Sequence, residues 1–435
     1  MKSTPARGLR RLPGPIVAAG MVLLATAAIP PGLRAEEPAV PPAKDEFPFS
    51  HRPHRAREIA WRAWSPAVFE EAVRAGKPVA VSLTATWCQK CHEMDEKAFS
   101  DPRVIELLNR RFICIRVDTD RYPEIKDRYL SGKGWPTTAF CTPGGDPMSK
   151  VWYVEADEFL TQANAAADHW EKNRESILRK IAEYRPPPLP ERTAAALEDV
   201  EAILAGIDAT WAKDDSAWAA GDFRFPSPQN IELYAWKAAA SGQKIWLDRA
   251  GRAARCTQAL EDPVEFGYYR VAMKPDWSDP HFEKLLETNA GMLAALVTLW
   301  RQTGDEEWGK AASRTVEFLQ ATLRQAAGGW GASQDADAEY FALDRAGRSK
   351  RAVPHIDGAF YSGLNAQTAS AFFAYAAVSG DAAAREAAVS ALDRTFRELW
   401  SEAGLAHGGG AGVNLLRDLA LAGDACLDAH QATGE

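Results

Sequence analysis

Apolar and polar positions follow two different periods along this chain. Between residues 65 and 185, short apolar runs of strand length alternate with segments of helical period, and the predicted order of elements after the first helix is βαβαββα. Such an order predicts an α/β domain. From residue 191 to the end, helical segments follow one another, which predicts an all-α domain.

The first helix of the α/β region is predicted over 65–75. It places Val68, Phe69 and Val73 on one face and ends at Gly76, which suits a left-handed helix C-cap. Further helices are expected over 101–109, 122–129 and 159–184, and strands are expected from Val79, over 112–118 and after Pro136, followed by a turn at Gly144 and Gly145.

The all-α region contains a repeated helix-ending signal. Four helices end with a small residue, a glycine and a polar residue, at Ser241-Gly242-Gln243, Thr303-Gly304-Asp305, Ser379-Gly380-Asp381 and Thr433-Gly434-Glu435. Each glycine can end one helix before the next begins, so each marks an antiparallel helical hairpin. We expect helices over 192–212, 228–240, 245–260, 282–302, 305–326, 363–378, 382–400 and 414–432. Stacked hairpins of this kind form a solenoid or a closed α/α toroid.

The segments before and between these regions predict how the chain is divided. Residues 1–35 carry five positive charges and no acid around a short apolar stretch, which predicts a secretory signal peptide. Residues 36–57 are proline-rich and predict a flexible linker, and the PPPLP run at 186–190 predicts the boundary between a domain over 58–185 and one over 191–435. We therefore expect an exported protein, periplasmic or secreted, with no stable membrane span after signal cleavage.

Composition and net charge restrict the classes of partner that this chain is expected to bind. The 435 residues are 46% hydrophobic and 25% charged, as in ordinary globular proteins, and the net charge is −8. Without the five positive charges of residues 1–35 the net charge is −13. That balance disfavours nucleic acid and acidic membrane surfaces as partners.

Two cysteines follow the apolar run that starts at Val79. Cys88 and Cys91 stand two residues apart at the expected start of a helix, after Trp87. Unpaired N–H groups and the helix dipole at that position favour a thiolate, and Lys90 adds a positive charge. We expect Cys88 to be the nucleophile and Cys91 the resolving cysteine of a redox-active disulfide, with no other cofactor.

The same cysteine spacing also serves other chemistry. His92 completes a CxxCH sequence, which is the attachment signature of c-type haem, and CxxC pairs also bind zinc. A zinc site needs two further ligands at recognisable spacing, which the sequence does not offer, so we expect no metal. The Trp135-Pro136 pair before a second apolar strand resembles the cis-proline position of thioredoxin-like folds, which implies that Pro136 lies against the sulfurs. In such a sheet Cys114 and Cys141 would flank the central strand on opposite sides, so we expect both to be buried free thiols.

The loops between the expected hairpins are long and rich in acids and aromatics. They contain Trp277, His281, Glu283, Asp335, Asp337, His355 and Asp357. Carboxylates beside flat rings are the groups that sugar chemistry uses, so these loops could line a carbohydrate pocket. The alternative is structural: Asp335 and Asp337 could cap the next helix.

Several motifs together resemble one family. The sequences WCQKCHEM, GWPTTAF, FRFPSP, PHFEKLLETNAGML and GGWGASQDADAE occur in an order that is similar to the spermatogenesis-associated protein 20-like family. The resemblance implies a thioredoxin-like domain joined to a six-hairpin, glycosidase-like α/α toroid, and it adds Asn289 to the candidate pocket. Ser82 stands where thioredoxins carry a buried aspartate that helps to deprotonate the resolving cysteine, so we expect either slower exchange or that His92 or Glu93 serves instead.

These observations predict an exported thiol–disulfide exchange protein whose helical toroid recognises a protein thiol or disulfide, or a sugar. Two alternatives stay open: a carbohydrate-active enzyme with a structural thioredoxin module, and a non-catalytic interaction scaffold. A closed six-hairpin ring needs twelve helices, and only about eight are predicted. We therefore expect the toroid to be truncated at its C-terminal side.

Overall fold

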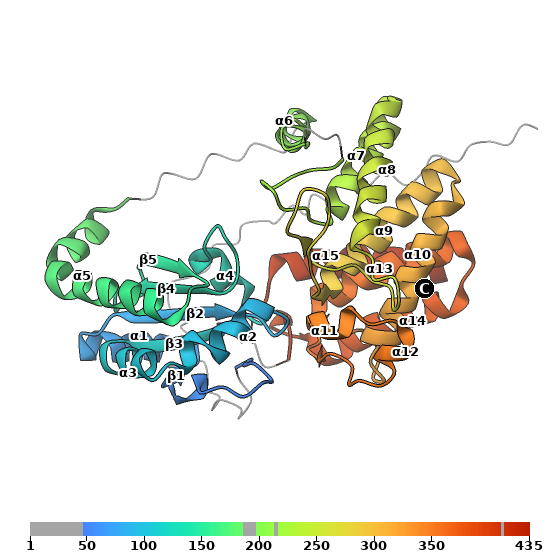
Figure 1. Ribbon diagram of the computed structural model, residues 1–435. Helices are drawn as coiled ribbons and strands as arrows, with labels where there is room; N and C mark the ends of the chain where they lie inside the picture. Colours follow the sequence, from blue (N-terminus) through green and yellow to red (C-terminus); the bar gives the residue numbers. More distant parts are fainter. Residues whose placement is uncertain (1–46, 186–196, 213–215, 410–412) are drawn as a thin grey trace, which may run out of the picture. The chain divides into compact units, whose positions relative to one another are not determined.

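The computed structural model describes residues 47–185, 197–212, 216–409 and 413–435, and residues 44–435 belong to one compact unit (Figure 1). The expected signal peptide, the linker up to residue 46 and the proline linker at 186–190 lie outside the described residues. Among the helices that are described, none is both long and apolar enough to cross a membrane.

A five-stranded mixed sheet forms the first domain, with strand order β1-β3-β2-β4-β5. Its strands are β1 (Trp61–Arg62), β2 (Val79–Thr84), β3 (Ile113–Asp118), β4 (Thr137–Cys141) and β5 (Pro147–Trp152). Strands β1 and β2 pair parallel with β3, whereas β4 pairs antiparallel with both β2 and β5. The central strand β2 is buried along its whole length, as its apolar sequence predicts.

Helices cover both faces of this sheet. They are α1 (Pro66–Ala75), α2 (Gln89–Glu96), α3 (Pro102–Arg111), α4 (Pro123–Tyr129) and α5 (Ala156–Glu183), with short 3₁₀ turns η1 (Ala56–Glu58) and η2 (Ala98–Ser100). Alternation along β2 sends Val79, Val81 and Leu83 into a core with α1 and α4, and Ala80 into a core with α3 and α5. The thioredoxin-like prediction is confirmed by this arrangement.

Local sequence signals were accurate in this domain. Helix α1 ends at Gly76, which has a left-handed φ of 64°. Cys114 and Cys141 lie on β3 and β4, on either side of β2, and both are buried free thiols, as expected. The short edge strand β1 was not predicted, because two residues carry no readable period.

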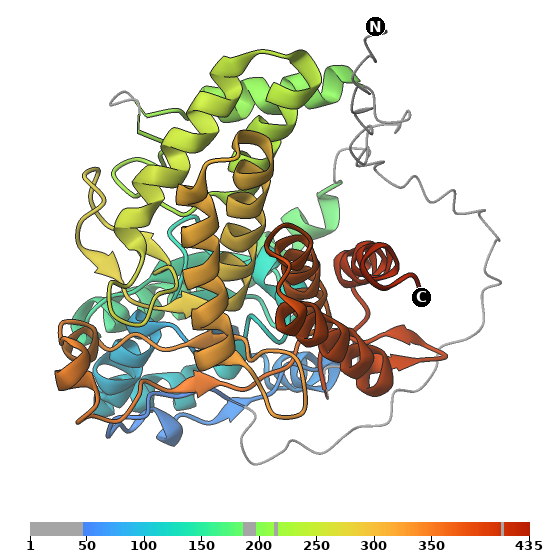
Figure 2. The ribbon, with the colours of Figure 1, turned by 90° about the vertical axis from the view of Figure 1, so that its right-hand side faces the viewer.

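The second domain is built from helical hairpins (Figure 2). The helices are α6 (Leu197–Asp208), α7 (Pro228–Ser241), α8 (Lys244–Thr257), α9 (Leu286–Thr303), α10 (Glu306–Phe318), α13 (Ser362–Ser379), α14 (Ala382–Leu399) and α15 (Leu416–Thr433). Helices α7, α9, α13 and α15 pack on one another in that order, while α8, α10 and α14 each pack on the helix before them. The four predicted glycines all have left-handed φ, between 68° and 80°. This inner and outer layering is that of an α/α fold, so the predicted fold class is confirmed.

The loops of this domain hold short elements that the sequence did not predict. They are β6 (Val271–Ala272), β7 (Pro280–His281), β8 (Lys284–Leu285), β9 (Ser333–Gln334), β10 (Ile356–Asp357), β11 (Trp400–Ser401), β12 (Gly404–Leu405), α11 (Ala338–Phe341), α12 (Arg345–Arg348), the 3₁₀ turn η3 (Gln258–Leu260) and the π-helical turn η4 (Leu319–Leu323). Strands β8, β9 and β10 form a three-stranded antiparallel sheet. The expected helix over 282–302 therefore begins later, at Leu286, because residues 284–285 pair with β9.

Two asparagines fasten these loops to the inner helices. On α9, Asn289 accepts a hydrogen bond from the Tyr268 N–H at 2.6 Å and donates to the Leu285 carbonyl at 2.9 Å. On α13, Asn365 makes the equivalent pair with the Trp330 N–H at 2.7 Å and the Tyr361 carbonyl at 3.1 Å. Asn289 thus satisfies buried backbone groups and has a structural task.

A buried charge cluster stabilises the same loops. The Asp262 carboxylate accepts from Lys284 Nζ at 2.7 Å and from both terminal nitrogens of Arg348 at 2.6 and 2.9 Å. All three side chains are almost fully buried. Each of these charged groups has lost its hydration on burial, and the ion pairs with its partners compensate for that loss.

We predict that Asp262→Ala lowers the free energy of unfolding by about 3–5 kcal/mol, because it leaves Lys284 and Arg348 buried without their counter-ion. Chemical denaturation of the full chain would measure the loss. A matched control is Glu339→Ala, which removes an exposed pair with Arg351 and should cost less than about 1 kcal/mol. Equal effects of the two substitutions would contradict the assignment.

Candidate functional site

The two cysteines of the CxxC motif form a disulfide at the start of α2. Cys88 is the N-cap residue of this helix, and the Cα atoms of Cys88 and Cys91 are 5.2 Å apart. The Cys91 N–H donates to Cys88 Sγ at 3.1 Å. The Trp135–Pro136 peptide bond is cis, as the resemblance implied. A reduced Cys88 would therefore meet a backbone donor and the positive end of a helix, which favour the thiolate.

The charged neighbours of the motif are already paired. Lys90 Nζ binds the Glu93 carboxylate at 2.9 Å and lies 5.0 Å from the centre of the Tyr153 ring. The positive charge that Lys90 adds to the motif is thus shared with Glu93, whose carboxylate is ion-paired. Burial lowers the pKa of His92 to about 4, so its imidazole is neutral, and its Nε2 has no hydrogen-bond partner among the described residues.

Apolar side chains from both domains cover the disulfide. Cys88 is 3% exposed and Cys91 is 2% exposed. Their cluster contains Trp87, and Trp135 packs against it together with Leu285, which belongs to the helical domain. The guanidinium of Arg270, also from the helical domain, lies 5.1 Å from the centre of the Trp87 ring. The sulfur atoms are thus enclosed partly by the second domain.

One face of the sheet β8-β9-β10 lies against the cluster around the disulfide. Opposed residues of paired strands share a face, so Leu285, Ser333 and Asp357 lie in a row. Leu285 packs against the disulfide cluster, while Asp357 interacts with Thr86, two residues before Cys88. Neighbouring strands are roughly 5 Å apart, so the row spans roughly 10 Å. The loops singled out in the sequence and the CxxC motif therefore meet at one place.

Four carboxyl groups lie around this place: Asp118 and Asp335 are buried, and Asp120 and Asp357 are half-buried. Burial and the Asp120 and Asp357 carboxylates raise the pKa of Asp118, and burial raises the pKa of Asp357. Burial raises the pKa of Asp120 to about 6, although the hydrogen bond from Trp87 Nε1 at 2.6 Å works against that shift. Burial and then the Asp357 and Glu283 carboxylates raise the pKa of Asp335 to about 8. These groups suppress one another's ionisation because they share a poorly hydrated space.

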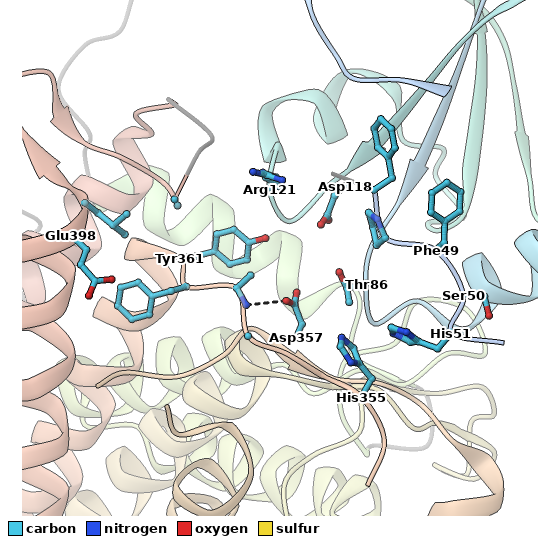
Figure 3. A pocket seen from close by; sticks show the side chains of 18 of the residues that line it. Phe49, Ser50, His51, Thr86, Asp118, Arg121, His355, Asp357, Tyr361 and Glu398 are labelled. Carbon is cyan, nitrogen blue, oxygen red and sulfur yellow. Dashed lines mark hydrogen bonds between the residues drawn. The ribbon is translucent and has the colours of Figure 1, made fainter. Parts of the chain in front are cut away.

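A cavity of about 860 Å³ opens beside these groups (Figure 3). The figure shows Asp118, Thr86 and Asp357 on one part of its wall, with His51 and His355 close together below them. The ring centres of His51 and His355 are 4.2 Å apart, and His51 Nε2 is 3.7 Å from Asp335 Oδ2. The wall also contains Phe47, Phe49, Arg57, Arg121, Phe360, Tyr361, Arg394 and Glu398. Both charges and aromatic rings therefore face the cavity.

The other residues predicted for a toroid pocket do not all lie together in the structure. Glu283 is 1% exposed and lies between Arg270 Nε at 3.4 Å and His281 Nδ1 at 4.0 Å. Asp337 is the N-cap of α11 and accepts from the Tyr340 N–H at 3.0 Å, which is the structural alternative considered for it. Trp277 is buried in the core of the helical domain with a left-handed φ of 65°. Of the predicted set, Glu283 and Asp335 interact electrostatically with each other, and His281 lies beside Glu283 and within the electrostatic reach of Lys90 in the CxxC motif. Asn289, Asp337 and Trp277 instead stabilise the fold.

Sequence reasoning missed several residues that join the two domains. They are His51, Asp120, Arg270, Leu285 and His407. Asp120 lies two residues after the end of strand β3, and side chains at the carboxyl ends of parallel strands converge, so a signal for it was present. The others have no local motif, because their role comes from contacts across the chain. Within the described residues, no group of three or more His, Cys, Asp or Glu side chains is arranged to hold a metal ion.

Sequence comparison finds a family model that matches the first domain and relatives that match most of the chain. Residues 44–185 match the family model described as "Protein of unknown function, DUF255", under the name Thioredox_DsbH. Spermatogenesis-associated protein 20 of Mus musculus is 24% identical over 338 residues, which cover 71% of this chain and 41% of that protein. The similarity to spermatogenesis-associated protein 20 agrees with the resemblance that the sequence motifs carry. The chain spans less than half the length of this relative.

Two further similarities are more distant. A thiol:disulfide interchange protein DsbD of Campylobacter jejuni is 30% identical over 86 residues, covering 19% of this chain and 15% of that protein. A family 76 glycoside hydrolase from a Bacteroides thetaiotaomicron strain aligns in structure with 14% sequence identity and a TM-score of 0.44, covering 55% of this chain and 51% of that one.

The raised pKa of Asp335 predicts a pH dependence. An acid that holds its proton more tightly in the folded state loses folding free energy as pH rises from its unfolded pKa of about 4 to its folded pKa of about 8. Asp335→Asn should therefore be increasingly more stable than the unsubstituted chain as pH rises from 4 to 8. Denaturant unfolding at several pH values would measure the difference. A difference that is constant across this range would contradict the prediction.

Proposed function

We propose that this chain is a thiol–disulfide oxidoreductase that works through Cys88 and Cys91. The observation that carries the proposal is the position of Cys88 at the N-cap of α2, where its sulfur accepts a hydrogen bond from the Cys91 N–H. The Cys88–Cys91 disulfide supports it, as does the local similarity to thiol:disulfide interchange proteins. Protein thiols or disulfides are the partners that such chemistry implies.

The exchange proceeds in two balanced steps. In the reducing direction, the Cys88 thiolate attacks one sulfur of a substrate disulfide, forms a mixed disulfide and releases the other substrate sulfur as a thiolate. The Cys91 thiolate then attacks Cys88 Sγ, which restores the Cys88–Cys91 disulfide and releases the second substrate sulfur. Two electrons pass from the cysteine pair to the substrate. The same steps run backward when the chain oxidises a dithiol.

The helical domain would take part in recognising the substrate. It supplies Leu285 at the disulfide and His355, Asp357 and Tyr361 at the cavity nearby. Aromatic rings and charges of both signs suit a polar segment of a partner protein, and a sugar attached to it would meet the same groups. The cavity is thus proposed as the place where a partner is held during exchange.

Export of the chain is part of the proposal. The basic, acid-free character of residues 1–35 around an apolar stretch supports a signal peptide, and an oxidising compartment would allow the disulfide to cycle. Expression of the full chain in a bacterial host, followed by fractionation and N-terminal sequencing, tests this. An unprocessed product in the cytoplasm would contradict export.

We predict that Cys91→Ser accumulates mixed disulfides with substrate proteins through Cys88, because the second step has lost its nucleophile. Non-reducing electrophoresis and mass spectrometry of the full chain would identify the adducts at Cys88. Adding Cys88→Ser to this variant should abolish them.

Cys114→Ser in the Cys91→Ser background is the matched control for that experiment. Burial raises the pKa of Cys114 to about 12, so its thiol is inert and the adducts should persist. Adducts that depend on Cys114 rather than on Cys88 would overturn the proposed function.

A further inference from the structure

The burial of both sulfur atoms limits the access of a substrate thiol or disulfide to the Cys88–Cys91 pair. An attacking sulfur must approach along the line of the S–S bond, yet both sulfurs lie in an apolar cluster that Leu285 and Trp135 complete. Leu285 belongs to the helical domain, whereas the cysteines belong to the thioredoxin-like domain. Exchange with a protein substrate therefore requires the two domains to separate at this point.

Among the polar contacts between the domains, one reaches a residue that is hydrogen-bonded to Trp87 of the motif. His407 Nε2 lies 2.8 Å from the backbone carbonyl oxygen of Asp120. The side chain of the same Asp120 accepts a hydrogen bond from Trp87 Nε1, and Trp87 precedes Cys88 in the chain. His407 of the helical domain thus holds the loop that positions the tryptophan next to the nucleophile.

The imidazole of His407 is fixed from several sides. Its Nδ1 lies 2.6 Å from Asp418 Oδ2 on α15, and its ring stacks on Tyr361 with centres 4.7 Å apart. The His407 carbonyl accepts from the Ser362 N–H at 2.8 Å. A Cβ at Gly363 would lie 2.1 Å from Asp418 Oδ1, so only glycine at that position lets Asp418 come this close to α13.

We propose that His407 is the latch that keeps the helical domain closed over the Cys88–Cys91 pair, and that a protein substrate gains access when the bond from His407 to the Asp120 carbonyl breaks. This inference rests on the proposed function, and it adds the regulation of the same site. The latch is defined as the hydrogen bond between His407 Nε2 and the Asp120 carbonyl.

The protonation state of His407 follows from its two partners. A carbonyl oxygen only accepts, so Nε2 must carry a proton, and Nδ1 beside the Asp418 carboxylate carries the other. Burial opposes this charge, but Asp418 and the Asp120 carbonyl raise the pKa of His407 above its ordinary value. The charged and titratable groups facing it are Asp418, Asp120, Glu124 and Tyr361. A neutral imidazole cannot donate to both partners, so the latch weakens as pH rises through this raised pKa.

Alkylation of the reduced full chain tests the latch. Iodoacetamide and a maleimide that carries a long polyethylene glycol chain both react with the Cys88 thiolate, so the ratio of their rates cancels the thiolate fraction and reports access alone. Peptide mapping gives the rate at Cys88. His407→Ala should raise the ratio of large to small reagent about ten-fold, which corresponds to 1.4 kcal/mol.

Four further samples make the result specific. His407→Gln keeps a donor near the position of Nε2 and should restore most of the closure, while His169→Ala, at an exposed histidine of α5, should match the unsubstituted chain. In the unsubstituted chain the ratio should rise with pH. In Asp418→Asn it should stay flat, because a neutral imidazole can then satisfy both partners. The pH dependence in Asp418→Asn also tests the latch on its own if His407→Ala fails to fold.

An unchanged ratio in His407→Ala, or the same pH slope in Asp418→Asn as in the unsubstituted chain, overturns the latch. Failure of the proposed function gives a different result. In that case Cys91→Ser traps no substrate at Cys88, whatever residue stands at position 407.

Discussion

The contact of Leu285 with the cluster around Cys88 and Cys91 is the constraint on which the rest of this arrangement depends. Because this leucine ends the short strand β8 and precedes helix α9, its position is fixed by the sheet with β9 and by the hairpin that α9 begins. The same sheet orients Ser333 and Asp357 beside it. A single apolar contact at the disulfide therefore aligns a row of polar groups with the CxxC region, and it couples the stability of the helical loops to the accessibility of the sulfurs.

Most of the fold could be predicted from the sequence, because its signals are local. The glycines that end the helical hairpins, the apolar run of β2 and the proline after Trp135 each determine backbone structure within a few residues. The short strands β8, β9 and β10 could not be predicted, since each is two residues long and exists only because it pairs with a distant segment. The expected start of helix α9 was early for that reason.

The candidate site was less predictable, and composition alone was a poor guide within it. Acids and aromatics in the loops suggested a pocket, but Asn289 and Asp337 satisfy backbone N–H groups, and Asp262 holds two buried cations. Polar residues in a loop that packs against a core must first satisfy that loop's own backbone. What distinguishes Asp335 and Glu283 is that each has a buried carboxylate oxygen without a hydrogen-bond partner among the described residues, which no sequence pattern reveals.

The buried carboxyl groups also bear on how the cysteines exchange protons. By the resemblance to thioredoxins, Ser82 occupies the position of their buried acid, so in the proposed exchange the proton of the resolving cysteine would go to another group. The Nε2 atom of His92 has no hydrogen-bond partner within the described part of the chain, but burial lowers the pKa of His92 to about 4, which makes it a weak base at neutral pH. Asp120, with a pKa of about 6, is better matched to proton transfer near neutrality, and its link to Trp87 places it beside the motif. Because His407 binds the backbone carbonyl of that same residue, the proposed latch would fix the position of this acid as well as the cover over the sulfurs.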